Sequence, residues 1–326
     1  MIPLDHLVTG LKAAGEPTRL RILLLLHRSE LTVSELQTVL HQSQPRVSRH
    51  LKLLVEADLL SRHTEGAHVF YRWASTDLAN QLLPALYPLV SHLDLIVERD
   101  RERLGEVRAA RAELAARSLA KVNEERALVA PLTAPPSQVE QTIEASVTVD
   151  PVDSFVDVGT GTGRMLELLS PRCRWSLGVE PSKEMLNLAR TRLDEAGLGD
   201  TQLRQASTYD LGLETGSISL AVAHHLLHYL DEPSQAVDEM ARVLAPDGQL
   251  LVVDYAPHQL EILRTRYQHR RLGLSEKEVV GWCGLAGLNR IEVHHIAPTI
   301  PPSDTESDQP ITPFAVTVWS ARKPSH

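Results

Sequence analysis

The sequence is poor in cysteine and has no long apolar run. Cys173 and Cys283 are the only cysteines among 326 residues, which excludes a framework of disulfide bonds. No apolar run reaches the length of a membrane-spanning helix, and the opening stretch MIPLDHLVTG lacks a basic region before an apolar core. These absences argue against a disulfide-stabilised scaffold, a secreted chain and a helical membrane protein. We therefore expect a cytoplasmic protein.

The length and composition are those of an ordinary globular protein. Hydrophobic residues make up 43% and charged residues 23% of the chain, and 326 residues suffice for two domains with separate cores. The net charge of -9 comes from the region after residue 130, whereas residues 1–73 carry a small excess of basic side chains. Because acidic surfaces repel nucleic acid, any contact with DNA is expected from the amino-terminal part.

Residues 1–76 predict short helices in a helix-turn-helix arrangement. Thr32 and Glu35 have the spacing of a capping box at the start of one helix. After a short turn, Ser43 is expected to cap the next helix, with Pro45 in its first turn. Apolar residues recur at helical spacing in this second helix, and its basic residues fall mainly on other faces. Two short helices with a tight turn, the second one basic near its start, are typical of DNA-binding proteins.

The stretch SRHTEGAHVFYRWA follows the second helix. Strand-favouring residues after Gly66 predict a hairpin, and a hairpin that follows a helix-turn-helix is a wing. The alternative is a solvated helix whose basic residues have no function. That alternative does not account for a cap, a turn, a basic face and a wing in this order.

These segments resemble the ArsR-type winged-helix repressors over about residues 4–74. The resemblance rests on GEPTRLRILLLL, LTVSELQTVL, SQPRVSRHLKLLVEADLL and the wing. It implies a homodimer that binds double-stranded operator DNA through the second helix in the major groove. The DNA-binding residues that it implies are Gln44, Arg46, Ser48, Arg49 and His50. Metal-sensing members often carry cysteines where this sequence has Thr32 and Ser34, so we expect no metal sensing by this domain.

Residues 77–130 are the predicted connection between two domains. Apolar residues such as Ile96, Leu104 and Val107 recur at helical intervals, which predicts a long helix with an apolar seam. A second copy of the chain would bury this seam, and we favour such dimerisation over the alternative that the helix packs on its own domain. The stretch APLTAPPSQ then breaks the helical pattern and leads into a second domain.

A glycine-rich turn, FVDVGTGTGR, opens the second domain. An apolar strand precedes it and a helical pattern follows it, and its glycines allow the backbone to approach a ligand closely. A dinucleotide-binding loop would require glycine at Arg164, and a Walker loop would require a Gly-Lys pair. The pattern instead alternates Gly159, Gly161 and Gly163 after Asp157.

An acidic residue ends the next predicted strand. Glu180 follows RWSLGV, and a carboxylate in this place can accept hydrogen bonds from both hydroxyls of a ribose. Met185, in the helix that follows, is a candidate for contact with a flat base. Strands and helices alternate through the rest of the domain, which predicts a doubly wound sheet with ligands at the carboxyl ends of its strands.

The second domain resembles the class I S-adenosylmethionine-dependent methyltransferases over about residues 140–326. The resembling pieces are FVDVGTGTGR, LGVEPSKEML, LAVAHHLLHYLDEP and ARVLAPDGQLLVVD, and GLNRIEVHHI with ITPFAVTVWSARK would be the closing antiparallel strands. The resemblance implies that S-adenosylmethionine or S-adenosylhomocysteine is the cofactor. Its implied binding residues are Asp157, Gly159, Gly161, Gly163, Glu180, Met185 and Ser207. Asp157 and the glycine backbone would hold its amino-acid part, and Glu180 its ribose. Ser207 and Ser219 stand where such domains usually carry acids, which puts catalysis in doubt more than cofactor binding.

Polar side chains near the ends of the later strands are candidates for catalysis. Methyl transfer needs an acceptor in line with the sulfonium methyl group, and a base helps where the acceptor must lose a proton. The candidate catalytic residues are His225, His228 and Tyr255, and residues 269–271 are candidates for binding an anionic substrate group. Alternatively, these histidines line the cleft without a catalytic role. Their spacing predicts no metal site, and two cysteines are too few for the thiolate ligands of arsenic-methylating enzymes.

The sequence therefore predicts a two-domain fold. An N-terminal α+β winged helix-turn-helix domain is expected at residues 1–76, a dimerisation helix at 77–130, and an α/β Rossmann-like, doubly wound methyltransferase domain at 131–326. We expect a DNA-binding transcriptional regulator whose second domain binds S-adenosylmethionine and methylates a small molecule. Two alternatives remain open. One is a repressor that senses S-adenosylmethionine or S-adenosylhomocysteine without turnover, and the other is a small-molecule methyltransferase whose winged helix only dimerises.

Overall fold

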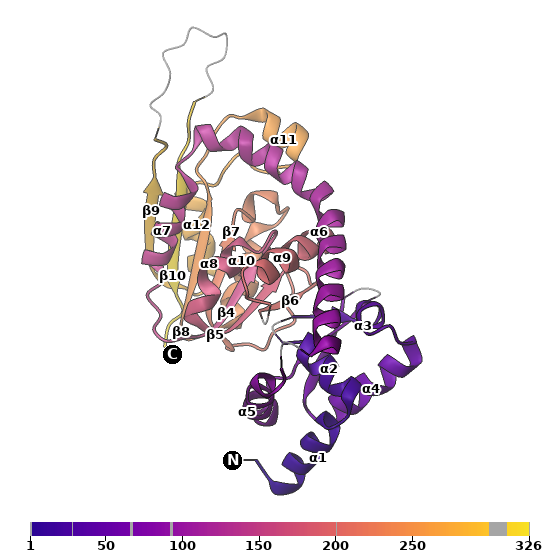
Figure 1. Cartoon of the computed structure of the whole chain (residues 1–326). Coiled ribbons are helices and arrows are strands. Elements are labelled where there is room, and N and C mark those ends of the chain that lie inside the picture. The colour runs from indigo at the N-terminus through magenta and orange to yellow at the C-terminus, as the bar shows by residue number, and fades with distance from the viewer. Residues whose placement is uncertain are drawn as a thin grey trace. The chain divides into compact units, whose positions relative to one another are not determined.

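The chain divides into two units with separate cores (Figure 1). The structure, a computed structural model, describes residues 2–27, 29–65, 68–91, 94–199, 201–299 and 312–325. Unit 1 comprises Met1–Leu114 and Arg190–Gln202, and unit 2 comprises Ala115–Ala189 and Leu203–His326. Within the described ranges, no helix is both long enough and apolar enough to cross a membrane.

Unit 1 consists of short helices and a small antiparallel sheet. Its elements are α1 (Leu4–Ala14), α2 (Pro17–Leu25), β1 (Leu31–Thr32), α3 (Val33–Leu40), α4 (Gln44–Glu56), β2 (Leu60–Glu65), β3 (His68–Trp73), α5 (Asp77–Leu86), the 3-10 turn η1 (Tyr87–Leu89) and the first part of α6 (Leu95–Val129). The sheet order is β1-β3-β2, and β2 pairs with β3 as the predicted wing. Gly66, the expected turn residue of the wing, lies outside the described residues.

Local capping and apolar spacing account for the helix-turn-helix. The capping box forms as predicted: the Glu35 N–H donates to Thr32 Oγ1 at 3.2 Å, and the Thr32 N–H donates to Glu35 Oε2 at 2.8 Å. In α4, Val47, Leu51 and Leu54 are fully buried in the core of unit 1. Their helical spacing leaves the opposite face of α4 free to carry basic residues.

The predicted single helix over 77–130 is wrong. The structure has α5 and α6, separated by the turn η1 and a short stretch whose described residues are not helical. Pro88 lies in η1, and a proline removes a backbone donor that a continuous α-helix requires. The seam is also divided: Leu104 and Val107 pack on the core of unit 1, whereas Ile96 is exposed. The alternative of packing on its own domain therefore holds for part of α6.

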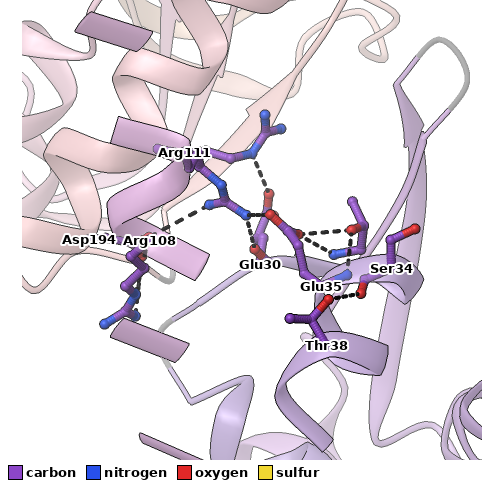
Figure 2. A network of polar contacts seen from close by, with 9 residues as sticks. Glu30, Ser34, Glu35, Thr38, Arg108, Arg111 and Asp194 are labelled. Carbon is purple, nitrogen blue, oxygen red and sulfur yellow. Dashed lines mark hydrogen bonds and ion pairs between the residues drawn. The ribbon is translucent and has the colours of Figure 1, made fainter. Parts of the chain in front are cut away.

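A buried charged network joins three helices of unit 1 (Figure 2). Arg111 of α6 donates from Nη2 to Glu35 Oε1 of α3 at 2.5 Å, and its Nη1 lies 3.7 Å from Asp194 Oδ2 of α9. Arg108 of α6 adds a second ion pair, with its Nε 3.4 Å from the same Asp194 oxygen. The side chains of Arg111 and Asp194 are only 8% and 9% exposed, so water screens their interaction weakly.

Unit 2 is built on a seven-stranded sheet of order β6-β5-β4-β7-β8-β10-β9. Its strands are β4 (Val152–Val158), β5 (Cys173–Val179), β6 (Gln202–Arg204, partly in unit 1), β7 (Ile218–His224), β8 (Leu244–Tyr255), β9 (Asn289–Ile296) and β10 (Val316–Arg322). Its helices are the end of α6, η2 (Ala130–Leu132), α7 (Pro136–Ser146), α8 (Arg164–Leu169), η3 (Ser170–Arg172), α9 (Lys183–Glu195, continuing into unit 1), η4 (Leu227–Tyr229), α10 (Pro233–Val243), α11 (Glu261–Tyr267) and α12 (Glu276–Leu285).

The direction of the strands confirms the predicted doubly wound fold. Strand β4 pairs in parallel with both β5 and β7, and β7 pairs in parallel with β8. The two last strands close the sheet as predicted, because β10 is antiparallel to both β8 and β9. The chain moves outward from β4 on one side and from β7 on the other, so the switch point lies between these two strands. Ligands of such sheets bind beyond the carboxyl ends of the strands at this point.

Candidate functional site

The glycine turn predicted from the sequence lies directly after β4, at the switch point. Gly159, Gly161 and Gly163 all have positive φ angles, of 68°, 51° and 78°. A Cβ atom at Gly159 would lie 2.5 Å from Leu226 Cδ1, so this position also requires glycine for space. The N–H of Gly159 donates to the carbonyl of Val179 at 2.8 Å, which ties the turn to the end of β5.

Asp157 is the buried acid of this turn. The Thr160 hydroxyl donates to its Oδ2 at 2.5 Å, whereas its Oδ1 is buried and has no hydrogen-bond partner within the described ranges. Burial, together with the nearby Glu180 charge, raises the pKa of Asp157 to about 7 against the opposing Thr160 bond. An unpaired buried carboxylate oxygen is costly, so a ligand donor such as an ammonium group would stabilise it.

Glu180 follows β5 and faces the glycine turn. Its Oε2 accepts a hydrogen bond from the Gly161 N–H at 3.0 Å, and its Oε1 accepts one from the Ser182 N–H at 3.0 Å. Burial raises the pKa of Glu180 even though both bonds lower it. Each carboxylate oxygen can accept a second bond, so the side chain retains acceptors for two ribose hydroxyls.

A pocket of about 530 Å³ lies beside the strand ends. Ser207, predicted from the sequence, lines it, and so do Thr208, Tyr209 and Tyr229. Met185 is half-buried at the start of α9 and is not among the residues that line this pocket.

The residues around the glycine turn suit an S-adenosyl nucleoside. The unpartnered oxygen of Asp157 and the glycine turn fit its amino-acid part, and the acceptors of Glu180 fit its ribose.

The three predicted catalytic residues lie together at the carboxyl ends of β7 and β8. The ring centroids of His225 and Tyr255 are 4.3 Å apart, and those of His228 and Tyr255 are 5.3 Å apart. His225 has a φ angle of 51°, a backbone conformation that non-glycine residues rarely adopt and that is enriched at functional sites. The structure therefore groups these residues, and their role in catalysis stays a prediction.

Asp254 organises this cluster, although the sequence analysis did not single it out. Its Oδ1 accepts a hydrogen bond from His228 Nδ1 at 2.6 Å, and the Tyr255 N–H donates to the same oxygen at 2.8 Å. Although burial opposes ionisation, His228 and His225 hold the pKa of Asp254 well below its usual range. The sequence signal that could have indicated Asp254 is an acidic residue near the carboxyl end of the buried strand QLLVVDY.

Two side chains of α6 also reach the site, and no pattern in the sequence indicated them. Glu125 accepts a hydrogen bond from the Tyr229 hydroxyl at 2.8 Å and lies 2.8 Å from His269 Nε2. Arg126 donates to the Thr162 hydroxyl of the glycine turn at 3.3 Å. More than a hundred residues separate Glu125 from its partners, so only the tertiary structure brings them together.

Other candidate residues lie elsewhere or are already paired. Arg270 forms an ion pair with Asp231 at 3.0 Å, and Arg271 donates to the carbonyl of Leu230 at 2.6 Å. Each guanidinium thus already has a protein partner, and its role as an anion site stays a prediction. Ser219 lies near the amino end of β7, where its N–H donates to the hydroxyl of Ser154 at 2.9 Å. Ser219 therefore lies at the opposite end of β7 from the carboxyl edge of the sheet. Serine in place of an acid at this position does not change that edge.

The predicted recognition residues lie on the first turns of α4. Gln44, Arg46 and Arg49 are exposed, and Ser48 is partly buried. The His50 ring is also partly buried, with its Nδ1 3.4 Å from a carboxylate oxygen of Glu16. Ser43 occupies the N-cap position, but its side chain makes no capping bond. Three of the five side chains thus project into solvent.

Two family models match the chain in succession. Residues 16–62 match the bacterial regulatory protein, arsR family, and residues 156–252 match the methyltransferase domain. An uncharacterized methyltransferase of Bacillus subtilis, YcgJ, is 32% identical over 151 residues, which cover 43% of this chain and 58% of that protein.

Two repressors match the other end of the chain. The arsenical resistance operon repressor of Escherichia coli is 50% identical over 62 residues, or 19% of this chain and 53% of that protein. The HTH-type transcriptional repressor SmtB of Mycobacterium tuberculosis is 41% identical over 76 residues, or 23% of this chain and 56% of that protein. The chain spans about half the length of each of these relatives. The chain therefore carries a segment that matches the arsR-family model, followed by a segment that matches the methyltransferase-domain model.

Proposed function

We propose that the protein is a dimeric, DNA-binding transcriptional regulator whose second domain binds S-adenosylmethionine and methylates a small molecule. The observation that carries the cofactor assignment is the buried Oδ1 of Asp157, which has no hydrogen-bond partner among the described residues and lies beside a turn of three left-handed glycines. When bound, S-adenosylmethionine supplies a methyl group activated by a positively charged sulfur. Asp157 would accept hydrogen bonds from its ammonium group, and Glu180 would accept them from its ribose.

The DNA-binding part of the proposal rests on α4. Arg46 and Arg49 are exposed on the helix that follows the turn, where arginine can contact both phosphates and guanine edges. Gln44 adds a side chain that can pair with adenine. The acidic balance of the rest of the chain repels DNA, so binding should depend on this helix.

A second copy of the chain is the proposed partner of α1. Leu4, Val8 and Leu11 recur at helical spacing on α1, and all three are exposed, Leu4 by 75%. A stripe of exposed apolar residues is typical of an interaction surface. A twofold dimer would place two copies of α4 on the two halves of an operator.

Fluorescence anisotropy with the promoter DNA of its own gene tests the regulator. We expect salt-sensitive binding that weakens more than tenfold when Arg46 and Arg49 are both replaced by alanine, because charge and base contacts are lost together. Arg174→Ala removes an exposed arginine of β5 and is the matched control. If the unchanged protein shows no salt-sensitive binding, the regulator hypothesis fails. The alternative of a methyltransferase whose winged helix only dimerises would then remain.

Incubation with a methyl donor labelled in its methyl group and a metabolite extract tests turnover. A labelled small product is expected. If calorimetry shows tight binding of both S-adenosylmethionine and S-adenosylhomocysteine while no product forms, the domain is a sensor without turnover. In either case, a ligand alters DNA affinity only if it binds the DNA-bound and free conformations unequally.

A further inference from the structure

Glu125, His228 and His269 bring one carboxylate and two imidazoles together in unit 2. They come from α6, from η4 and from the segment after α11, and one ligand atom of each lies within 4.8 Å of the other two. We propose that these three side chains bind a divalent transition-metal ion, with zinc as the ion that their chemistry favours. The proposed site is separate from the winged helix and does not depend on the methyl-transfer function.

Each of the two histidines carries a buried nitrogen that has no hydrogen-bond partner among the residues that the structure describes. His228 Nδ1 lies 2.6 Å from a carboxylate oxygen of Asp254, and a carboxylate can only accept, so this nitrogen carries the proton. His228 Nε2 is then a bare acceptor, and it has no hydrogen-bond partner within the described ranges. His269 differs, because its Nε2 lies 2.8 Å from Glu125 Oε1 and so faces the other proposed ligand, whereas its Nδ1 has no hydrogen-bond partner within the described ranges. Both residues are only 1% exposed.

Unpaired lone pairs at this depth require a cation or a proton donor. A buried acceptor left without a partner is costly, and an ion bound at His228 Nε2 would remove that cost. The short His228 to Asp254 bond is also the arrangement that orients a metal-binding imidazole, because a carboxylate behind the ring fixes the tautomer and raises the basicity of the other nitrogen. Asp254 itself is held by the Tyr255 N–H, so it acts behind His228 rather than as a ligand.

The donor set identifies the class of ion. Two imidazoles and one carboxylate with a fourth position left for water or substrate form a set that zinc accepts at metal-to-ligand distances of about 2.0–2.2 Å. The ligand atoms must therefore draw closer than they now lie. The His228 and His269 rings, whose centroids are 4.2 Å apart with a tilt of 34°, must also splay. Glu125 has a second oxygen, so it can ligate an ion while it keeps one of its present bonds.

One side chain connects the proposed site to a pocket. Tyr229, whose hydroxyl donates to Glu125, also lines the pocket of about 530 Å³ that contains Ser207. A fourth ligand that enters through this pocket could therefore be water or a group of a bound small molecule. The second three-residue group, His225 with His228 and Asp254, shares His228 with the proposed site.

Equilibrium dialysis of the full chain against Zn²⁺ or Co²⁺, after removal of metal with a chelator, tests the proposal. We expect about one ion per chain by elemental analysis and the visible absorption of tetrahedral Co²⁺. His228→Ala and His269→Ala should abolish binding, and Asp254→Asn should weaken it by about 10–100-fold. His294→Ala, on the exposed edge strand β9, is the control and should bind as the unchanged protein does.

X-ray absorption of the zinc-loaded, unmutated protein decides the outcome even if a variant fails to fold. Nitrogen and oxygen ligands with the multiple-scattering pattern of two imidazoles would support the site. Sulfur ligands, binding that persists in both histidine variants, or no bound ion would overturn it.

Discussion

Asp157 shows how one residue can combine a structural cost with a functional use. The fold buries this carboxyl completely and leaves one oxygen unpaired in the described part of the chain, which raises its pKa to about 7. Because the ordinary pKa of aspartate is near 4, the ligand-free fold binds this proton more tightly than the unfolded chain does. The contribution of Asp157 to stability is therefore greatest below about pH 4, and it is lost as the pH rises through 7.

Cofactor binding should have the opposite dependence on pH. An ammonium group prefers the ionised carboxylate, so we expect affinity for S-adenosylmethionine to fall as the pH drops below 7, by up to about tenfold per pH unit. Titration calorimetry at several pH values between 6 and 8 measures this slope. Asp157→Asn should bind more weakly at pH 8 and lose the slope.

Asp153→Asn is the control for this measurement. Asp153 lies in the same strand, β4, but is exposed and far from the glycine turn. Its variant should keep the slope of the unchanged protein. An equal slope in the Asp157 variant would show that another group governs the dependence.

At the scale of elements, buried charged side chains connect helices that lie far apart in the sequence. Arg111 connects α3 and α9 to α6, and the Arg111 charge with the Thr32 bonds holds the pKa of Glu35 below its usual value against the effect of burial. Glu35 thus contributes stability above its unfolded pKa, and this contribution is lost as the pH falls through its lower folded pKa.

Arg111→Ala should destabilise unit 1 by about 3 kcal/mol, because it leaves Glu35 and Asp194 buried with less compensation. Hydrogen exchange measured by mass spectrometry on peptides from α3 would show this as faster exchange. Arg266→Ala breaks an ion pair with Glu124 in which both side chains are more than half exposed, and it should cost less than about 1 kcal/mol. Unchanged exchange in α3 would show that the network carries little energy.

At the scale of the whole molecule, the exposed apolar stripe of α1 is the surface that the proposed dimer would bury. Replacing Leu4 and Leu11 by glutamate should shift the protein from dimer to monomer in analytical ultracentrifugation, because charge would enter the proposed interface. Operator affinity should fall with it, since a monomer contacts only one half-site.

Ile262→Glu tests whether any exposed apolar residue has this effect. Ile262 lies on α11 of unit 2 and is 38% exposed, close to the exposure of Val8. Its variant should sediment as the unchanged protein does. A monomeric unchanged protein would refute the dimer proposal outright.

Local patterns in the sequence were sufficient for most of the fold. Thr32 with Glu35 predicted the start of α3, the spacing of Val47, Leu51 and Leu54 predicted the buried face of α4, and alternating glycines predicted the turn after β4. Each of these signals depends on residues a few positions apart, so backbone geometry alone makes them readable.

Only the tertiary structure decided which distant side chains share a site. The break between α5 and α6 depends on how Pro88 is accommodated, and the meeting of Glu125, His228 and His269 depends on three separate segments. Long-range contacts of this kind leave no periodic trace in the sequence, because their partners are set by packing and not by spacing. Short motifs were thus enough to indicate which family each domain resembles, whereas the buried histidine cluster and the charged network became visible only in the folded chain.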